Sequence, residues 1–366
     1  MIPAGYLAIP DAGSSAVAGL FRKLQGRALE AMFARSFHAL SPPLARAMPA
    51  VHRAVLEVAR RDRAAVADAV RSPDVLAPVF AAETGAITRD DALRGAVPAL
   101  LAGLANALPA PVAWEVPVPE PTAQSLASAR TPITDRVHLA IADANPMAHV
   151  EDHPDKQGNA VDLGGRSAGE WRDALVEALA VIERALPALR AELDVTLARV
   201  VPVGVDEERH LSASYREAPG LVYMTLHPSA LTMAEAVVHE TQHGKLNALT
   251  WFDPVLDNAR TAWTSSPVRP DLRPLIGVLL AVHAFVPVAA LHARLAELSH
   301  PLAASPVFER RRREVYAGNA AGLQTLRERG EPTPTGRRVL DALDALHAAT
   351  APPSATGDGG DLALLG

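Results

Sequence analysis

Two histidines four residues apart, with a glutamate directly after the first, form the pattern in this sequence that is most specific for chemistry. The segment reads His239-Glu240-Thr241-Gln242-His243. Residues four apart on a helix share one face, so both imidazoles can reach one cation at about 2.0–2.2 Å. Thr232 and Glu235 have the spacing of a capping box, which predicts a helix that starts at Met233. The pattern therefore predicts a metal site on a helix.

A third protein ligand is expected, because two histidines alone leave a metal site incomplete. His283 is the only polar side chain in the apolar stretch 275–291, and a buried imidazole needs a partner. Pro287, four residues later, cannot donate to the carbonyl of His283, so we expect the helix to kink beside it. We predict His283 as the third ligand.

Other acidic and histidine side chains downstream of the motif have ordinary interpretations. Three aspartates lie where loops and turns are expected, and His292 and Glu297 belong to a stretch typical of a solvated helix face. The aspartates are Asp253, Asp257 and Asp271. His149 and His153 are also four apart, but Pro154 follows them directly and indicates an acidic loop.

Ligand types alone leave the metal open, because imidazole suits both zinc and iron. With zinc, Glu240 would be the general base that activates a bound water for peptide hydrolysis. With Fe(II) and open positions, the ion could bind a 2-oxo acid and dioxygen, and Glu240 would orient a ligand. A third alternative is a non-catalytic peptide-binding protein with a structural metal.

The elements that must position these residues follow from periodicity. Apolar residues recur every three or four positions over 14–107, which predicts four or five helices, and five prolines then interrupt 108–121. Strands are expected at 137–142, 200–205 and 221–226. Further helices are expected at 170–193, with a kink or end at Pro187, from about 275, at 308–329 and at 336–349. This predicts an α+β fold, predominantly α-helical, with a small β-sheet beside the HExxH helix.

We expect three regions along the chain: a helical N-terminal region at 1–115, a metal-binding catalytic region at 116–350, and a disordered tail at 351–366 that is rich in Pro, Gly, Ser and Asp. The boundary falls within the proline-rich segment.

Composition excludes several classes of protein. The 366 residues contain no cysteine, so any metal must use His, Asp or Glu. A net charge of −6 argues against a nucleic-acid partner, and the arginine run 310–313 is interpreted as a solvated helix face. The apolar run 274–291 contains His283 and Pro287, which favours a buried core helix over a membrane span. The N-terminus lacks the pattern of a secretory signal, which favours a cytoplasmic location.

The stretches LTMAEAVVHETQHGKLNAL (231–249) and RPDLRPLIGVLLAVHAF (269–285) resemble a known family, and a weaker likeness lies at 141–146. The family is the 2-oxoglutarate-dependent HExxH-type peptide β-hydroxylases, which modify ribosomally made natural-product precursors. The resemblance implies an Fe(II) enzyme that uses 2-oxoglutarate and dioxygen to hydroxylate a side-chain β-carbon of a precursor peptide. It implies His239, His243 and His283 as iron ligands.

That chemistry also requires a cation for the distal carboxylate of 2-oxoglutarate, and the planar fork of arginine is the usual choice. Arg269 and Arg273 precede the helix of His283, and Arg273 stands beside its expected first turn. We predict these two arginines as the cosubstrate site, with Arg260 in reserve.

Overall fold

The fold is predominantly helical with a small mixed sheet, as the sequence predicts. The computed structural model describes residues 9–10, 16–34, 39–150, 159–265 and 272–353. These ranges contain twelve α-helices and seven short β-strands. The predicted disordered tail 351–366 lies almost wholly outside the described residues.

Five helices form the N-terminal region, at the upper end of the predicted number. Two of their starts are capped by side chains: Asp62 accepts from the Ala65 amide, and Thr88 accepts from the Asp91 amide. The proline-rich segment 108–119 then forms neither helix nor strand, and a short helix follows. The five helices are α1 (Ala16–Met32), α2 (Pro42–Arg61), α3 (Arg63–Val70), α4 (Pro73–Glu83) and α5 (Arg89–Gly103), and the short helix after the proline-rich segment is α6 (Glu120–Ala127).

The main sheet has five strands in the order β1-β2-β3-β5-β4. Strand β3 pairs in parallel with β2 and β5, and the edge strands β1 and β4 pair antiparallel to their neighbours. The strands are β1 (Arg130–Pro132), β2 (His138–Ala140), β3 (Arg199–Val205), β4 (Ser212–Ala213) and β5 (Leu221–Leu226). The predicted strands at 137–142, 200–205 and 221–226 are thus confirmed as β2, β3 and β5.

Two helices connect β2 to β3, and Pro187 separates them. The predicted helix 170–193 is α7 (Ala168–Ala185) followed by α8 (Pro187–Thr196), because a proline begins a helix more easily than it continues one. A complete capping box at Ser167 and Glu170 starts α7. Trp171, Leu175 and Ile182 of α7 pack with Val200 and Val222 on one face of the sheet.

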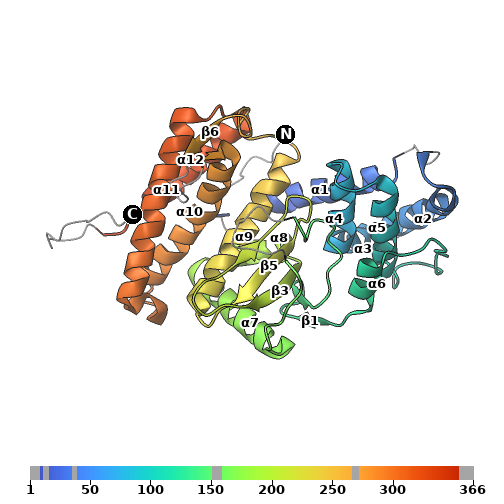
Figure 1. Ribbon diagram of the computed structural model, residues 1–366, viewed down its shortest axis with the longest axis horizontal. Coiled ribbons are helices and arrows are strands. Elements are labelled where there is room, and N and C mark those ends of the chain that lie inside the picture. Colours follow the sequence, from blue (N-terminus) through green and yellow to red (C-terminus); the bar gives the residue numbers. More distant parts are fainter. Residues whose placement is uncertain (1–8, 11–15, 35–38, 151–158, 266–271, 354–366) are drawn as a thin grey trace.

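The C-terminal part consists of four long helices, the first of which carries the HExxH motif. They are α9 (Ala230–Thr250), α10 (Leu275–Glu297), α11 (Pro306–Arg329) and α12 (Pro334–Ala349), with a hairpin of β6 (Trp263–Ser265) and β7 (Leu272–Pro274) before α10 and a short 3-10 helix at Pro301–Ala304. In Figure 1, α9 lies between the N-terminal helices on one side and α10 to α12 on the other.

Helix α10 is the apolar helix expected from 275, and it is helical through Pro287. It is long and apolar enough to cross a membrane, but 72% of its most apolar stretch is buried inside the fold. The expectation of a buried core helix is thus confirmed.

The largest hydrophobic cluster joins both sides of the predicted boundary near residue 115. It contains Leu20, Leu44 and Phe80 from the N-terminal helices together with Leu246 of α9 and Leu279 of α10. The N-terminal helices and the metal-bearing helix therefore share one core, which holds α9 in place from both sides.

Candidate metal centre

Helix α9 carries the metal motif, and it begins earlier than its sequence predicts. Ser229 is the N-cap, and its hydroxyl accepts from the amide of Thr232. The predicted capping box and the start at Met233 are wrong. Ser229 caps the helix before Thr232, and the carboxylate of Glu235 binds His292 and Arg311. The helix therefore has an extra turn before His239.

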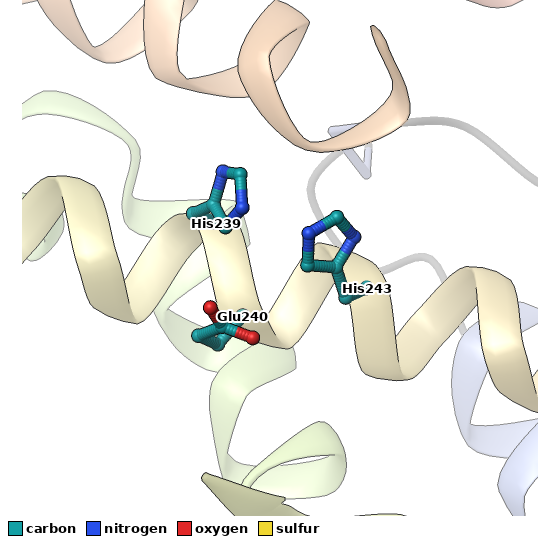
Figure 2. A group of neighbouring side chains, drawn as sticks. All are labelled: His239, Glu240 and His243. Atoms are coloured by element: carbon teal, nitrogen blue, oxygen red, sulfur yellow. The ribbon is translucent and has the colours of Figure 1, made fainter. Parts of the chain in front are cut away.

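His239, Glu240 and His243 form one group on α9. Their candidate ligand atoms all lie within 4.8 Å of one another. The two rings meet edge to face with centroids 4.3 Å apart, and the ring of Phe285 lies 4.5 Å from His239. Figure 2 shows the two imidazoles on one side of the helix and the carboxylate on the other. Within the described ranges, no other three His, Asp or Glu residues form such a group.

The two imidazoles of this group are suited to binding a cation. Each has an Nδ1 atom that is buried and has no hydrogen-bond partner in the described structure. Burial, with a smaller contribution from His243, lowers the pKa of His239 to about 3, and burial also lowers the pKa of His243. Both rings are therefore neutral at physiological pH and offer lone pairs without first losing a proton. The residues present thus fit a metal ion.

Glu240 is buried and is held by two serine hydroxyls, one on β4 and one directly after it. Ser212 donates to one carboxylate oxygen at 2.6 Å, and Ser214 donates to the other at 2.7 Å. Burial raises the pKa of Glu240, but the two neighbouring histidines and the serine hydroxyls outweigh it and hold the pKa below its ordinary value. Glu240 is therefore an oriented carboxylate with one hydroxyl donor on each oxygen. Sequence reasoning missed both serines, which belong to a polar stretch between two predicted strands.

His283 is fully buried on α10, but the structure does not bring it into the group of His239, Glu240 and His243. Its ring makes a hydrogen bond with the backbone of Gln242, and burial holds its pKa well below the ordinary value. That bond uses one of the two ring nitrogens, and Nδ1 is a buried atom that makes no hydrogen bond in the described structure. Its role as third ligand stays a prediction.

A second polar network adjoins the metal group, one turn earlier on α9. His292 donates to Glu235 at 2.7 Å, and Arg311 donates to the other carboxylate oxygen at 3.0 and 3.1 Å. Burial raises the pKa of Glu235, but His292 and Arg311 outweigh it and lower the pKa overall. Since Glu235, His239 and His243 are each four residues apart, they share one face of the helix.

Two sequence interpretations fail at this network. His292 was expected to be solvated, yet its side chain is fully buried, because α9 and α11 cover it. The run 310–313 is only partly a solvated face: Arg310 and Arg313 are exposed, Arg312 is buried, and Arg311 binds Glu235. The guanidinium of Arg311 also lies 5.9 Å from the ring centroid of Phe285, the residue that contacts His239.

The other predicted positions are distributed as follows. Arg273 lies on β7, and its side chain is close to Gly277 in the first turn of α10, whereas Arg269 lies outside the described residues. Asp253 accepts from the Val255 amide at 2.8 Å, which confirms its turn role. Glu297 is more than half exposed and pairs with Arg294, as expected of a solvated face.

Five predicted positions are left, and two of them, Asp257 and Arg260, are exposed residues of a turn. His149 is exposed. Asp271 and His153 lie outside the described residues. The loop interpretation of the second histidine pair therefore stays a prediction.

The fold and this group define a mostly helical α+β protein with a candidate metal centre on a buried HExxH helix. Neither a scan of the chain against protein-family models nor a search of curated proteins finds a match. The geometry of the centre and the sequence resemblance are therefore the two observations that bear on its function.

Proposed function

We propose that this protein is an Fe(II)- and 2-oxoglutarate-dependent oxygenase that hydroxylates a side-chain β-carbon of a ribosomally made precursor peptide, in the cytoplasm. The observation that carries the proposal is the group itself: two neutral imidazoles one turn apart on a buried helix, each with an unbonded Nδ1. The resemblance of 231–249 and 269–285 to the HExxH-type peptide β-hydroxylases selects iron over other metals.

The environment of Glu240 favours an oxygenase over the zinc peptidase. A general base must exchange a proton with the reacting water, which requires a carboxylate oxygen that is available to it. Each oxygen of Glu240 already accepts a hydroxyl hydrogen bond, from Ser212 or Ser214, and the carboxylate lies on the other side of the helix from the imidazoles (Figure 2). This supports a role for Glu240 in positioning the histidine-bearing helix against the sheet.

In this proposal, His239 and His243 hold the iron, with His283 as the predicted third ligand. Bound iron would supply the oxidation, in which 2-oxoglutarate and dioxygen yield succinate and carbon dioxide and one oxygen atom enters the peptide. The half-buried rings of His239, His243 and Phe285 limit the access of bulk water to one side of the centre. Arg273 and Arg269 stay the predicted anchors of the distal carboxylate, and Arg311 joins them as a candidate because it lies beside Phe285.

Succinate formation tests the proposal without knowledge of the peptide. Protein purified without metal should release succinate from 2-oxoglutarate only when Fe(II) and dioxygen are both present, and His239→Ala should abolish the release. Addition of the correct precursor should produce a peptide heavier by one oxygen atom. Peptide cleavage with zinc alone and no 2-oxo acid would contradict the proposal.

Glu240→Gln separates the two enzyme classes. A peptidase that uses Glu240 as its base should lose all activity. The proposed hydroxylase should keep its metal and part of its succinate release, because glutamine can still accept one of the two serine hydrogen bonds.

A further inference from the structure

A cavity of about 240 Å³ lies away from the metal group, where α3 and α4 meet the sheet. Four arginines line it, together with His138 at the start of β2 and Ser72 at the start of α4. The arginines are Arg71, Arg130, Arg136 and Arg199. None of these residues belongs to the group on α9. We name this cavity the arginine pocket.

The carboxylates around the arginine pocket do not balance its guanidiniums. Asp74 is buried and binds Arg199 through both oxygens at 2.6 Å, and it also accepts from Arg130 at 2.9 Å. One carboxylate thus serves two arginines. Asp68 pairs with Arg136 at 3.1 Å, and both of these side chains are about half exposed.

Arg71 adds a charge that forms no ion pair with a carboxylate among the described residues, and Asp68 and Asp194 attract it only from a longer distance. Its guanidinium donates to the backbone carbonyls of Arg136 at 2.9 Å and Asp194 at 2.7 Å, and to that of Leu197. Carbonyl dipoles orient this side chain but do not neutralise it. Asp135 is the one further carboxylate that lines the pocket.

The neighbouring histidine responds to this excess of positive charge. Burial lowers the pKa of His138, and Arg130, Arg199 and Arg71 each lower it further, with no carboxylate acting in the opposite direction. The hydroxyl of Ser72 makes no capping hydrogen bond to α4 and is therefore available to a ligand. The pocket thus offers guanidinium forks and a hydroxyl in a region of positive potential.

The geometry points to a binding site for a phosphate group in the arginine pocket. Guanidinium forks match the oxygens of phosphate, and the negative charge of a phosphate would offset the one positive charge that Asp68, Asp74 and Asp135 leave in excess. Ligand cavities for drug-sized molecules measure about 300–1,000 Å³, so this one suits a smaller ligand. Inorganic phosphate and a small phosphomonoester are the two sources of that group.

Titration calorimetry with inorganic phosphate tests the site, with sodium chloride adjusted to hold the ionic strength constant. We expect saturable binding to one site and a matching rise in melting temperature. Glycerol phosphate in place of phosphate separates the two sources: tighter binding assigns the rest of the cavity to an organic group, and equal binding assigns the site to free phosphate. No saturable binding of either anion would overturn the inference.

Two variants with opposite expected effects locate the site. Arg136→Gln should weaken phosphate binding about tenfold, because one charged hydrogen-bond donor is lost. It leaves in place the Arg136 carbonyl that holds Arg71. Asp68→Asn should tighten binding by a similar factor, since it frees Arg136 from its partner.

Arg166→Gln is the matched control. Arg166 and Glu170 form an ion pair at 3.4 Å, with side-chain exposures of 47% and 51%, against 48% and 55% for Arg136 and Asp68. Neither residue lines the pocket. The inference fails if Arg136→Gln binds phosphate as the wild type does, or if Arg166→Gln weakens binding equally.

Discussion

His292 donates a 2.7 Å hydrogen bond to Glu235, one helical turn before the first histidine of the metal motif. The bond joins α10 to α9, and Arg311 extends the connection to α11 through the second carboxylate oxygen. The face of α9 that carries His239 and His243 is therefore fixed against α10 and α11. Because charged hydrogen bonds stabilise more than neutral ones, this network is well placed to set the position of the motif.

Arg311→Gln tests the network. The substitution removes a paired guanidinium from Glu235, and we expect unfolding to become easier by about 1 kcal/mol, because Arg311 is partly exposed to solvent. The same variant should raise the concentration of 2-oxoglutarate needed for half-maximal succinate release if Arg311 contributes to the cosubstrate site. Urea unfolding and a 2-oxoglutarate titration measure the two effects.

Arg310→Gln is the control for that variant, since Arg310 belongs to the same run of arginines and is exposed. It should change the free energy of unfolding by less than about 0.5 kcal/mol. It should leave unchanged the concentration of 2-oxoglutarate needed for half-maximal succinate release. Equal effects of the two variants would show that Arg311 acts only as surface charge.

Loss of either motif histidine should abolish metal binding. His239→Ala and His243→Ala each remove one of the two neutral imidazoles in the group, so anaerobic loading with Fe(II) should leave less than a tenth of the wild-type metal content. His52→Ala is the control, because His52 stacks on Phe33 in the N-terminal helices, outside the metal group. Elemental analysis measures the content. Wild-type loading of both motif variants would contradict the assigned centre.

His283→Ala decides the question of the third ligand. If His283 completes the centre, its loss should weaken Fe(II) binding at least tenfold, measured by competition with a chelator. A loss of stability with unchanged Fe(II) affinity would make His283 a core residue alone, held by its hydrogen bond with the backbone of Gln242.

The serine pair tests the positioning of Glu240. Ser212→Ala and Ser214→Ala each leave one buried carboxylate oxygen without its donor, and each should lower the free energy of unfolding by about 1–3 kcal/mol. In a Glu240→Gln background, the cost of one serine substitution should fall clearly, because the amide nitrogen accepts no hydrogen bond. Denaturant unfolding of the three single and two double variants measures this coupling. Equal costs in both backgrounds would separate the serines from Glu240.

Local periodicity explains why the sequence predicts much of the fold. Strand β5 spans 221–226 as expected, and α10 begins at Leu275, because alternating and apolar patterns reflect the immediate backbone. The breaks at Pro187 and in 108–121 follow from a residue that lacks an amide hydrogen. These features depend on neighbours in the chain, which a sequence displays directly.

Long-range contacts explain what the sequence does not predict. Ser212 reaches Glu240 because β4 pairs antiparallel with β5, which places Ser212 opposite Met224, and no local pattern contains that register. His292 has charged neighbours in sequence and so resembles a surface residue, yet packing of α9 and α11 buries it. The partners of a polar side chain are decided by which helices cover it.

The buried carboxylate of Asp74 predicts a loss of stability in acid. Burial raises its pKa, but Arg199, Arg130 and Ser125 outweigh that effect and lower the pKa overall. A carboxyl whose pKa falls on folding stabilises the protein above its unfolded pKa, about 3.9, and this contribution is lost as the pH falls through the folded value. At pH 7, Asp74→Asn should be less stable by about 3 kcal/mol.

The difference in free energy of unfolding between the wild type and Asp74→Asn should narrow as the pH falls below about 4, because the wild-type carboxyl then becomes neutral as well. Urea unfolding of both proteins between about pH 3 and about pH 7 measures this difference. Steps of ~1 pH unit place measurements on both sides of the unfolded pKa of aspartate. A gap that stays constant or widens in acid would show that Asp74 is not held ionised by its arginines.

Lys245 and Glu192 form a buried ion pair, and we expect the loss of one partner to destabilise the fold. Lys245 is fully buried on α9, two residues after His243. Its ammonium group binds Glu192 of α8 at 2.8 Å. Burial lowers the pKa of Lys245 and raises that of Glu192, so each group depends on the other to remain charged. Removal of one partner leaves an uncompensated buried charge and should cost about 3–5 kcal/mol, as measured for Lys245→Met alone by urea unfolding.

The double variant Lys245→Met with Glu192→Leu should recover most of that loss, because two apolar side chains of similar volume need no partner in the core. Its Fe(II) content should match the wild type, since neither residue belongs to the metal group. A double variant as unstable as the single one would mean that packing, rather than the unpaired charge, causes the loss. A double variant that folds without binding iron would mean that the pair also positions the motif histidines.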